Sequence, residues 1–218
     1  MISVVLPTYN GQKYLCESID SVVDQTICDW ELIIVDDGSE DDTGIIAEQY
    51  AKKDDRIHVI HNEYNQKLPE SLNIGFRQAK GEFLTWISDD NLYKPQALEK
   101  MRNYLIKDET CMMVVGNTIL FRGNEEERYR FDQKNMYVVN TVGGCFLYRR
   151  KVLEEIGEYD KEKFLVEDYD YWLRILSKYG RIGYIDADLF RFRIHKDSLT
   201  SKKTAEVKYQ VDLLRREY

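Results

Sequence analysis

Two pairs of adjacent aspartates are the residues of this chain best placed to do chemistry. Asp36 and Asp37 directly follow the apolar run 31–35, and Asp89 and Asp90 follow the run 83–87. Short, continuously apolar runs are typical of strands buried on both faces of a parallel sheet. Ligands of such sheets bind in the crevice beyond the carboxyl ends of the strands. We therefore expect both pairs to lie in one pocket.

Four carboxylates in one pocket repel one another unless a cation or hydrogen-bond donors compensate their charge. A divalent metal that holds a nucleoside diphosphate would provide this compensation, because such ions prefer carboxylate and phosphate oxygens. The two pairs therefore suggest an enzyme that uses sugar nucleotides.

The overall charge argues against a nucleic-acid binder, which needs a broad basic face. Among 218 residues, 31 Lys and Arg stand against 39 Asp and Glu, a formal net charge of −8. One basic strip nevertheless contains five cations and a single acid, and it could meet a diphosphate or an anionic membrane surface. A solvated charged stretch is the alternative interpretation. The cations of the strip are Arg191, Arg193, Lys196, Lys202 and Lys203. Arg191, Arg193 and His195 alternate along the chain, which predicts a strand-like segment with the three side chains on one face.

The cysteines and the hydropathy pattern indicate where such a protein works. The four cysteines show no C-x-x-C spacing and no clustered histidines, so we expect no zinc site and, for several of them, a place as small core side chains. A strand-like segment starts at Ile2 and leaves no room for a signal peptide. No apolar run approaches the about 20 residues of a membrane span. We expect a cytoplasmic protein with reduced thiols that can make peripheral contact with the inner face of the membrane.

The first half of the chain alternates strand and helix patterns. A capping box at Ser39 and Asp42 and prolines at positions 69 and 95 mark helix starts. This alternation predicts a doubly wound, mostly parallel sheet over residues 1–110. The expected strands are 2–7, 31–35, 57–60 and 83–87, and the expected helices end near residues 25, 52, 81 and 107.

The second half is less regular. Segment 112–121 predicts one long or two short strands, 123–134 a charged loop or edge hairpin, and 141–149 a further strand. Helices are expected at 151–156 and 167–178, and an amphipathic helix in 201–218. We expect one domain, in which 1–110 binds the nucleotide sugar and 111–200 binds the acceptor.

Four motifs in a fixed order carry a family resemblance. They are Leu-Pro-Thr-Tyr-Asn at 6–10, Val-Asp-Asp-Gly-Ser at 35–39, Ser-Asp-Asp-Asn at 88–91 and Val-Glu-Asp-Tyr-Asp-Tyr-Trp at 166–172. No single motif is decisive, because acidic strand ends occur in many α/β proteins. In this order and spacing they resemble the family 2 glycosyltransferases of the GT-A fold, over residues 1 to about 200.

The resemblance implies a Rossmann-like, mostly parallel central sheet flanked by helices, with a smaller mixed sheet on the acceptor side. It also implies inverting transfer of a sugar from a UDP-sugar, or another nucleoside diphosphate sugar, to a hydroxyl of a saccharide or lipid-linked acceptor. Surface polysaccharide synthesis is the expected setting. The residues that the resemblance assigns to the donor are Pro7, Thr8, Tyr9, Asp37, Lys67, Asp89 and Arg193.

Within that set, Tyr9 would offer a flat face to the base and Asp37 would accept the N–H of uracil. Asp36 either caps the following helix or supports the loop. Leu72 stands where the family commonly has Arg, which leaves Asn73 with either a base contact or a structural role.

The metal predicted by the resemblance is Mg²⁺ or Mn²⁺, held by Asp90 and His195 between the two phosphates. Carboxylate oxygens suit these ions, and the ion would stabilise charge on the leaving diphosphate. The motif is the shorter variant, with Ile87 where the fuller form has another Asp. A purely structural His195 is the alternative.

Asp168 is the predicted catalytic base, which removes the proton of the acceptor hydroxyl. A helix N-terminus lowers the pKa of such a carboxyl group and burial raises it. Gly144, Glu167 and Trp172 are the predicted acceptor-binding residues, and Trp86 is expected in the core. The alternative is that Glu167 and Asp168 only cap the helix.

Other functions fit less well. A receiver-like signalling module also opens with a strand that ends in paired acids, but here a complete strand–helix unit precedes Asp36. A nucleotidyltransferase would need an early Gly-rich loop followed by Arg and Lys, and a dehydrogenase a G-x-G-x-x-G after the first strand. A catalytically idle nucleotide-sugar-binding homologue stays an alternative, although Asp89, Asp90 and Asp168 are all present.

Overall fold

The computed structural model describes all 218 residues, and its first half confirms the predicted alternation of strands and helices. The four strands lie within one or two residues of their predicted bounds. The elements are β1 (Ile2–Thr8), α1 (Leu15–Val23), β2 (Trp30–Asp36), α2 (Thr43–Ala51), β3 (Ile57–His61), α3 (Leu68–Gln78), β4 (Phe83–Trp86) and α4 (Ala97–Lys107).

The strands of the second half continue the same sheet. The nine-stranded sheet has the order β3-β2-β1-β4-β8-β6-β9-β5, and β7 pairs with β6. β1 to β4 are parallel, whereas β8 is antiparallel to both β4 and β6. The predicted mixed acceptor-side strands are therefore an extension of the central sheet. These strands are β5 (Leu92–Tyr93), β6 (Met113–Arg122), β7 (Glu125–Tyr129), β8 (Phe146–Arg149) and β9 (Gly183–Arg193).

Four further helices complete the chain, and none of the helices is long and apolar enough to span a bilayer. The longest, α6, begins at the Glu167-Asp168 pair. The four are α5 (Arg150–Ile156), α6 (Glu167–Tyr179), α7 (Leu199–Lys202) and α8 (Thr204–Leu214).

Three local predictions were wrong. Residues 141–145 form a loop before β8 rather than part of a strand, and Gly143 there has φ +64°. β9 is one strand of 11 residues, of which only the end was predicted. The capping box does not form, because Ser39 Oγ accepts a hydrogen bond from the Asn10 N–H at 2.9 Å instead of capping α2.

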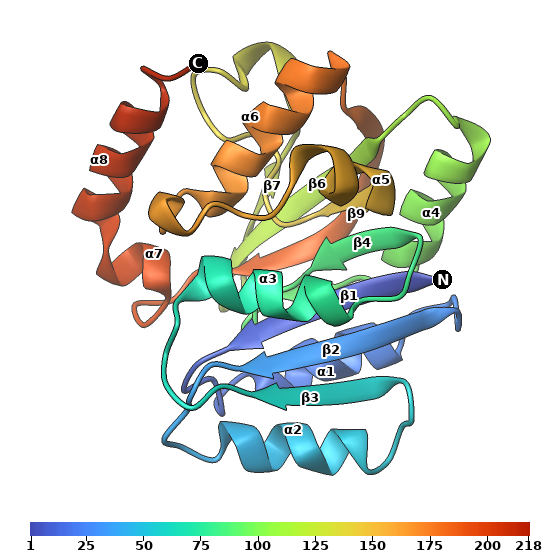
Figure 1. Cartoon of the computed structure of the whole chain (residues 1–218), viewed down its shortest axis with the longest axis vertical. Coiled ribbons are helices and arrows are strands. Elements are labelled where there is room, and N and C mark those ends of the chain that lie inside the picture. The colour runs from blue at the N-terminus through green and yellow to red at the C-terminus, as the bar shows by residue number, and fades with distance from the viewer.

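The central strands are buried on both faces, as their continuous apolar runs require. Val4, Leu6 and Ile34 face one core cluster, which α1, α2 and α4 cover. Val5 and Val35 face a second cluster, which α3, α5 and α6 cover. In Figure 1, α3 lies in front of the sheet and α1 behind it. The helices on the second face bring α6, and with it Asp168, onto the same sheet as the two acidic pairs.

Gly75 lets α3 approach β1 closely. A methyl group added at Gly75 would come within 2.4 Å of Val5 Cγ1 and 3.2 Å of Val35 Cγ2. Both valines are completely or almost completely buried in central strands, so neither can move away without disturbing the sheet.

We expect Gly75→Ala to lower the free energy of unfolding by about 1–2 kcal/mol. The gain in helix propensity, about 1 kcal/mol, is smaller than the overpacking cost of about 1–3 kcal/mol. Urea unfolding measures the difference. Gln78→Ala, on the exposed side of the same helix, is the control and should change stability by less than about 0.5 kcal/mol. A more stable Gly75→Ala protein would contradict this packing argument.

Candidate functional site

β1 and β4 separate at their carboxyl ends. β1 pairs with β4 only as far as Val5, opposite Trp86, but stays paired with β2 as far as Thr8, opposite Asp36. Pro7 lies in the stretch that β4 no longer accompanies, where its missing N–H costs no ladder hydrogen bond. The carboxyl ends of β1 to β4 all point to the left in Figure 1.

Thr8 and Asp89 meet between the separated ends of β1 and β4. Thr8 Oγ1 donates a hydrogen bond to Asp89 Oδ2 at 2.6 Å, so the ends of β1 and β4 are joined through side chains. Burial raises the pKa of Asp89 to about 7, and the neighbouring Asp90 adds to the rise, against the lowering effect of Thr8. Burial and the second carboxylate of the pair therefore outweigh the hydrogen bond from Thr8.

The end of β9 closes on the second acidic pair. His195 Nε2 lies 2.8 Å from Asp90 Oδ2, and Arg193 Nε donates to the Asp90 carbonyl oxygen at 3.0 Å. Arg193 also forms an ion pair with Glu17 of α1 at 2.7 Å. Arg191 instead pairs with Glu126 of β7 at 2.6 Å. Of the alternating basic residues, Arg193 and His195 thus reach the acidic loop.

Asp90 and His195 make a hydrogen bond with each other in this structure. Of the two side chains, the carboxylate is the kind of ligand that Mg²⁺ and Mn²⁺ prefer. The other ring nitrogen of His195, Nδ1, is buried without a hydrogen-bond partner. No three His, Cys, Asp or Glu side chains come together that could hold a metal by themselves. The residues present fit an ion that a ligand helps to bind.

The first acidic pair divides into two roles. Asp37 Oδ1 accepts from Asn62 Nδ2 at 2.7 Å and from the Gln66 N–H at 2.9 Å, which leaves Oδ2 available to a ligand. Asp36 holds its loop through the Ser39 N–H at 3.1 Å and through His61 Nδ1 at 3.0 Å. Asp36 thus supports the loop, which was one of the two expected roles.

Tyr9 and Lys67 lie beside this loop but differ in direction. The Tyr9 side chain is 47% exposed at the end of β1, where it can offer its ring to a planar group. The Lys67 ammonium group lies 5.3 Å from the centre of the Phe164 ring. Lys67 has φ +71° at the start of α3, and its side chain faces the segment before α6. Asn73 is structural, because its side chain exchanges two 2.9 Å hydrogen bonds with the Tyr159 backbone.

The acceptor-side carboxylates sit in the first turn of α6. Asp168 Oδ1 accepts from the Tyr169 N–H at 2.6 Å, and Oδ2 accepts from Asn140 Nδ2 at 3.0 Å. Burial nevertheless raises the pKa of Asp168. Glu167 is 4% exposed, its Oε2 has no partner, and burial together with Asp168 raises its pKa to about 8. Burial therefore outweighs the helix N-terminus for both groups.

Trp172 does not line a pocket, so this prediction was wrong. Its side chain is completely buried, with its ring centre 4.4 Å from that of Phe146 in β8. Trp86, which was expected in the core, is instead half-buried. Packing alone requires a glycine at position 144, because an added methyl group would come within 2.3 Å of Phe190 Cε1.

Sequence reasoning missed Asn62 and Asn140, which hold Asp37 and Asp168. Each contacts its aspartate across 25 or more residues. Asn is common in loops for its turn-forming ability, so neither residue carried a signal of its role.

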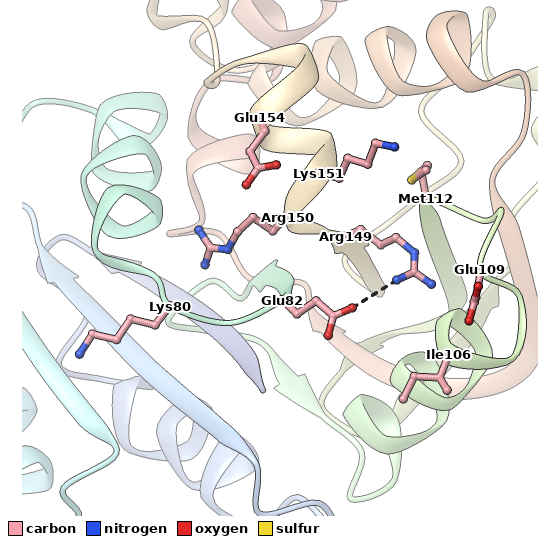
Figure 2. A pocket seen from close by; sticks show the side chains of 9 residues that line it. All are labelled: Lys80, Glu82, Ile106, Glu109, Met112, Arg149, Arg150, Lys151 and Glu154. Atoms are coloured by element: carbon pink, nitrogen blue, oxygen red, sulfur yellow. Dashed lines mark hydrogen bonds and ion pairs between the residues drawn. The ribbon is translucent and has the colours of Figure 1, made fainter.

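A pocket of about 780 Å³ lies at the opposite end of the central strands, beside the starts of β4 and β6 (Figure 2). It contains several cations, but two of them serve the fold. Arg149 donates to the carbonyl oxygens of Leu105 and Cys111, and Arg150 to those of Ala79 and Gly81. These guanidinium groups thus bind carbonyl groups at and beyond the C-terminal ends of α4 and α3.

A comparison with protein families decides the identity of this arrangement. The model of glycosyl transferase family 2 matches residues 3–157. The chain belongs to glycosyl transferase family 2. The predicted glycosyltransferase, with its α/β fold and nucleotide-sugar chemistry, is thereby confirmed at the level of the family.

Known relatives agree with this family. The UDP-Glc:alpha-D-GlcNAc-diphosphoundecaprenol beta-1,3-glucosyltransferase WfgD of Escherichia coli is 28% identical over 98% of this chain and 85% of its own. The structure of S. aureus TarS 1-349 in complex with UDP-GlcNAc has a TM-score of 0.79 at 21% identity, over 98% of this chain and 66% of that one. The mannosyltransferase PcManGT of Pyrobaculum calidifontis, in complex with GDP-Man and Mn²⁺, has a TM-score of 0.79 at 18% identity. It matches 100% of this chain and 64% of its own. The glycosyltransferase thus has the GT-A fold and spans about two thirds of these two structures.

His61 should make stability depend on pH through its contact with Asp36. Burial lowers the pKa of His61, but its hydrogen bonds to Asp36 and Glu48 outweigh burial and raise the pKa above its ordinary value. The stabilisation is therefore complete below about pH 6.5, the ordinary pKa of His, and is lost as the pH rises through the pKa in the folded state.

We expect the melting temperature to fall between pH 6 and pH 8 in the unmodified protein more than in His61→Gln. His58→Gln, an exposed histidine of the same strand, is the matched control and should keep the steeper fall. Parallel curves for the protein and for His61→Gln would show that this ion pair does not stabilise the fold.

Proposed function

We propose that this glycosyltransferase moves a sugar from a UDP-sugar to a hydroxyl of a lipid-linked saccharide, with a divalent metal and inversion at the sugar carbon. The observation that supports this proposal is the pair of contacts Thr8–Asp89 and Asp90–His195, which bring the ends of β1 and β4 and the segment after β9 together at one acidic pair. Residues 1–110 would bind the donor and 111–200 the acceptor.

Asp37 would select the base of the donor. Its free Oδ2 accepts hydrogen bonds only, which suits the N–H of uracil, and Tyr9 would lie against the ring. The UDP-GlcNAc complex of TarS supports a UDP-sugar. PcManGT holds GDP-Man on a similar fold, so the choice of uracil rests on Asp37.

Asp90 and His195 would hold Mg²⁺ or Mn²⁺ together with the donor diphosphate. A bound ion supplies a positive charge that stabilises the leaving diphosphate. Mn²⁺ in PcManGT supports a metal on this fold. Asp89 would bind the ribose or the donor sugar, and Arg193 would lie over the phosphates once its pairing with Glu17 opens.

Asp168 would act as the general base. The acceptor oxygen forms a bond to the anomeric carbon while the bond from that carbon to the diphosphate breaks, and the hydroxyl proton passes to Asp168. A raised pKa brings this group nearer to neutral pH, where a general base is most effective. Burial and the neighbouring Asp168 also raise the pKa of Glu167, which favours its protonated form beside the base.

The surface beside Asp168 favours an acceptor with an apolar part. Tyr137, Val138 and Val139 are 47%, 59% and 43% exposed and directly precede Asn140, the partner of Asp168. WfgD, whose name gives a diphosphoundecaprenol-linked acceptor, supports a lipid-linked substrate. A peripheral position at the inner face of the membrane and a role in surface polysaccharide synthesis would follow.

Asp168→Asn should lower transfer by about 10²–10⁴-fold, the usual contribution of a general base, with UDP affinity nearly unchanged. The assay is UDP or GDP release from a panel of nucleotide sugars with Mn²⁺ and GlcNAc-diphosphoundecaprenol, and calorimetry measures UDP binding. Full transfer by Asp168→Asn would remove Asp168 from the mechanism. Asp170→Asn, in the same helical turn, is the control for changes in folding.

Asp90→Ala should weaken UDP binding in the presence of Mn²⁺ at least about tenfold, but change it little in EDTA, because the ion joins Asp90 to the phosphates. Calorimetry with and without Mn²⁺ checks this. Asp212→Ala, an exposed carboxylate of α8, should bind like the unmodified protein. Equal Mn²⁺ dependence of Asp90→Ala and the unmodified protein would exclude Asp90 as a ligand.

A further inference from the structure

We infer that Asn140 is a positioning residue that orients the Asp168 carboxylate for proton removal, an inference that rests on the proposed function. Asn140 lies in the loop between β7 and β8, 28 residues before Asp168 in the chain. In this proposal it acts on the acceptor hydroxyl through Asp168.

The hydrogen bonds of Asn140 fix the direction of its amide. Oδ1 accepts from the Val142 N–H at 3.1 Å. A backbone N–H can only donate, so the oxygen of the amide must face Val142 and the NH₂ group must face Asp168. Nδ2 then donates to Asp168 Oδ2 at 3.0 Å. The opposite orientation would place two acceptor oxygens against each other.

The loop that carries Asn140 is itself fastened at both ends. Tyr129, the last residue of β7, donates its hydroxyl to the Asn140 carbonyl oxygen. Thr141 Oγ1 donates to the Asp132 carbonyl oxygen at 2.9 Å. Tyr169 of α6 donates to the Met136 carbonyl oxygen at 2.7 Å. The loop therefore holds the amide in place from β7 and from α6, and the amide does not depend on Asp168 for its position.

Asn140 fixes the plane of the carboxylate together with the Tyr169 N–H. One donor binds each oxygen of Asp168, so the carboxyl group cannot rotate without losing both hydrogen bonds. Each oxygen can accept a further hydrogen bond, so a lone pair stays available to an acceptor hydroxyl. The arrangement presents a rigid, oriented base.

The same two donors favour the charged form of Asp168. Asn140 and Tyr169 lower its pKa, against burial, which raises it. The titratable groups that face Asp168 are Glu167, next to it on α6, and Tyr159, from the segment before α6. Neither carries a positive charge, so the hydrogen bond from Asn140 has no cationic substitute.

The test is the pH profile of kcat/KM for UDP release in Asn140→Ala and Asn140→Asp. We expect the acidic limb of Asn140→Ala to move up by about one to two pH units, the effect of losing one hydrogen bond to a charged group. Asn140→Asp should move it further, because a second carboxylate would stand against the first. Loss of orientation should also lower kcat about 10²-fold at the pH optimum.

Tyr129→Phe tests the effect of the loop separately from the effect of the Asn140 amide. It removes the hydroxyl that holds the Asn140 carbonyl and should lower the melting temperature, but it should move the acidic limb less than Asn140→Ala does, because Thr141 and Tyr169 still hold the loop. If the acidic limb of both Asn140→Ala and Asn140→Asp lies at the same pH as in the unmodified protein, the inference is overturned and Asn140 is a structural residue. Full activity of Asp168→Asn would instead overturn the proposed function, so the two failures are distinguishable.

Discussion

The site depends on the point at which β1 and β4 part. Beyond the hydrogen bond from the Ile87 N–H to the Val5 carbonyl oxygen, β1 and the segment after β4 are no longer paired. Their ends diverge, and side chains join them. Thr8 and Asp89 make this link with one hydrogen bond of 2.6 Å. This divergence explains why a proline is tolerated at position 7 and why Tyr9 is exposed. It also sets the position of the second acidic pair.

Uncompensated negative charge is the second common property of the site. Burial raises the pKa of Asp89 to about 7 and that of Glu167 to about 8, and no lysine or arginine lies close enough to offset either shift. The nearby Arg193 is already paired with Glu17. Burial penalises the charged form of both carboxyl groups. The proposed metal–diphosphate complex would favour the charged form of Asp89 instead.

Elements with a periodic local pattern were predicted from the sequence, whereas features that depend on contacts between distant residues were not. The strands up to β4 and helices α3, α4 and α6 followed from apolar periodicity and from Pro69 and Pro95, because these signals are local. β9 was recognised only at its end, since Asp186 and Asp188 and the irregular pairing with β6 around Asn117 interrupt its apolar pattern. The position of Trp172 in the core and the contact of Asn140 with Asp168 depend on how α6 packs on the sheet, which no local pattern encodes.

The two halves are coupled through the core rather than through a ligand. Asn73 of α3, a helix of the first half, binds the Tyr159 backbone with two hydrogen bonds, and the Tyr159 ring stacks on Tyr171 of α6 with centres 4.2 Å apart. Arg77 and Glu158 add an ion pair beside them. The segment that leads into Asp168 is thus fixed to the helix that starts beside Asp37. Protein interiors are close-packed and transmit small displacements. The distance between the Asp89-Asp90 pair and the proposed base is therefore set when the protein folds, before any donor or acceptor binds.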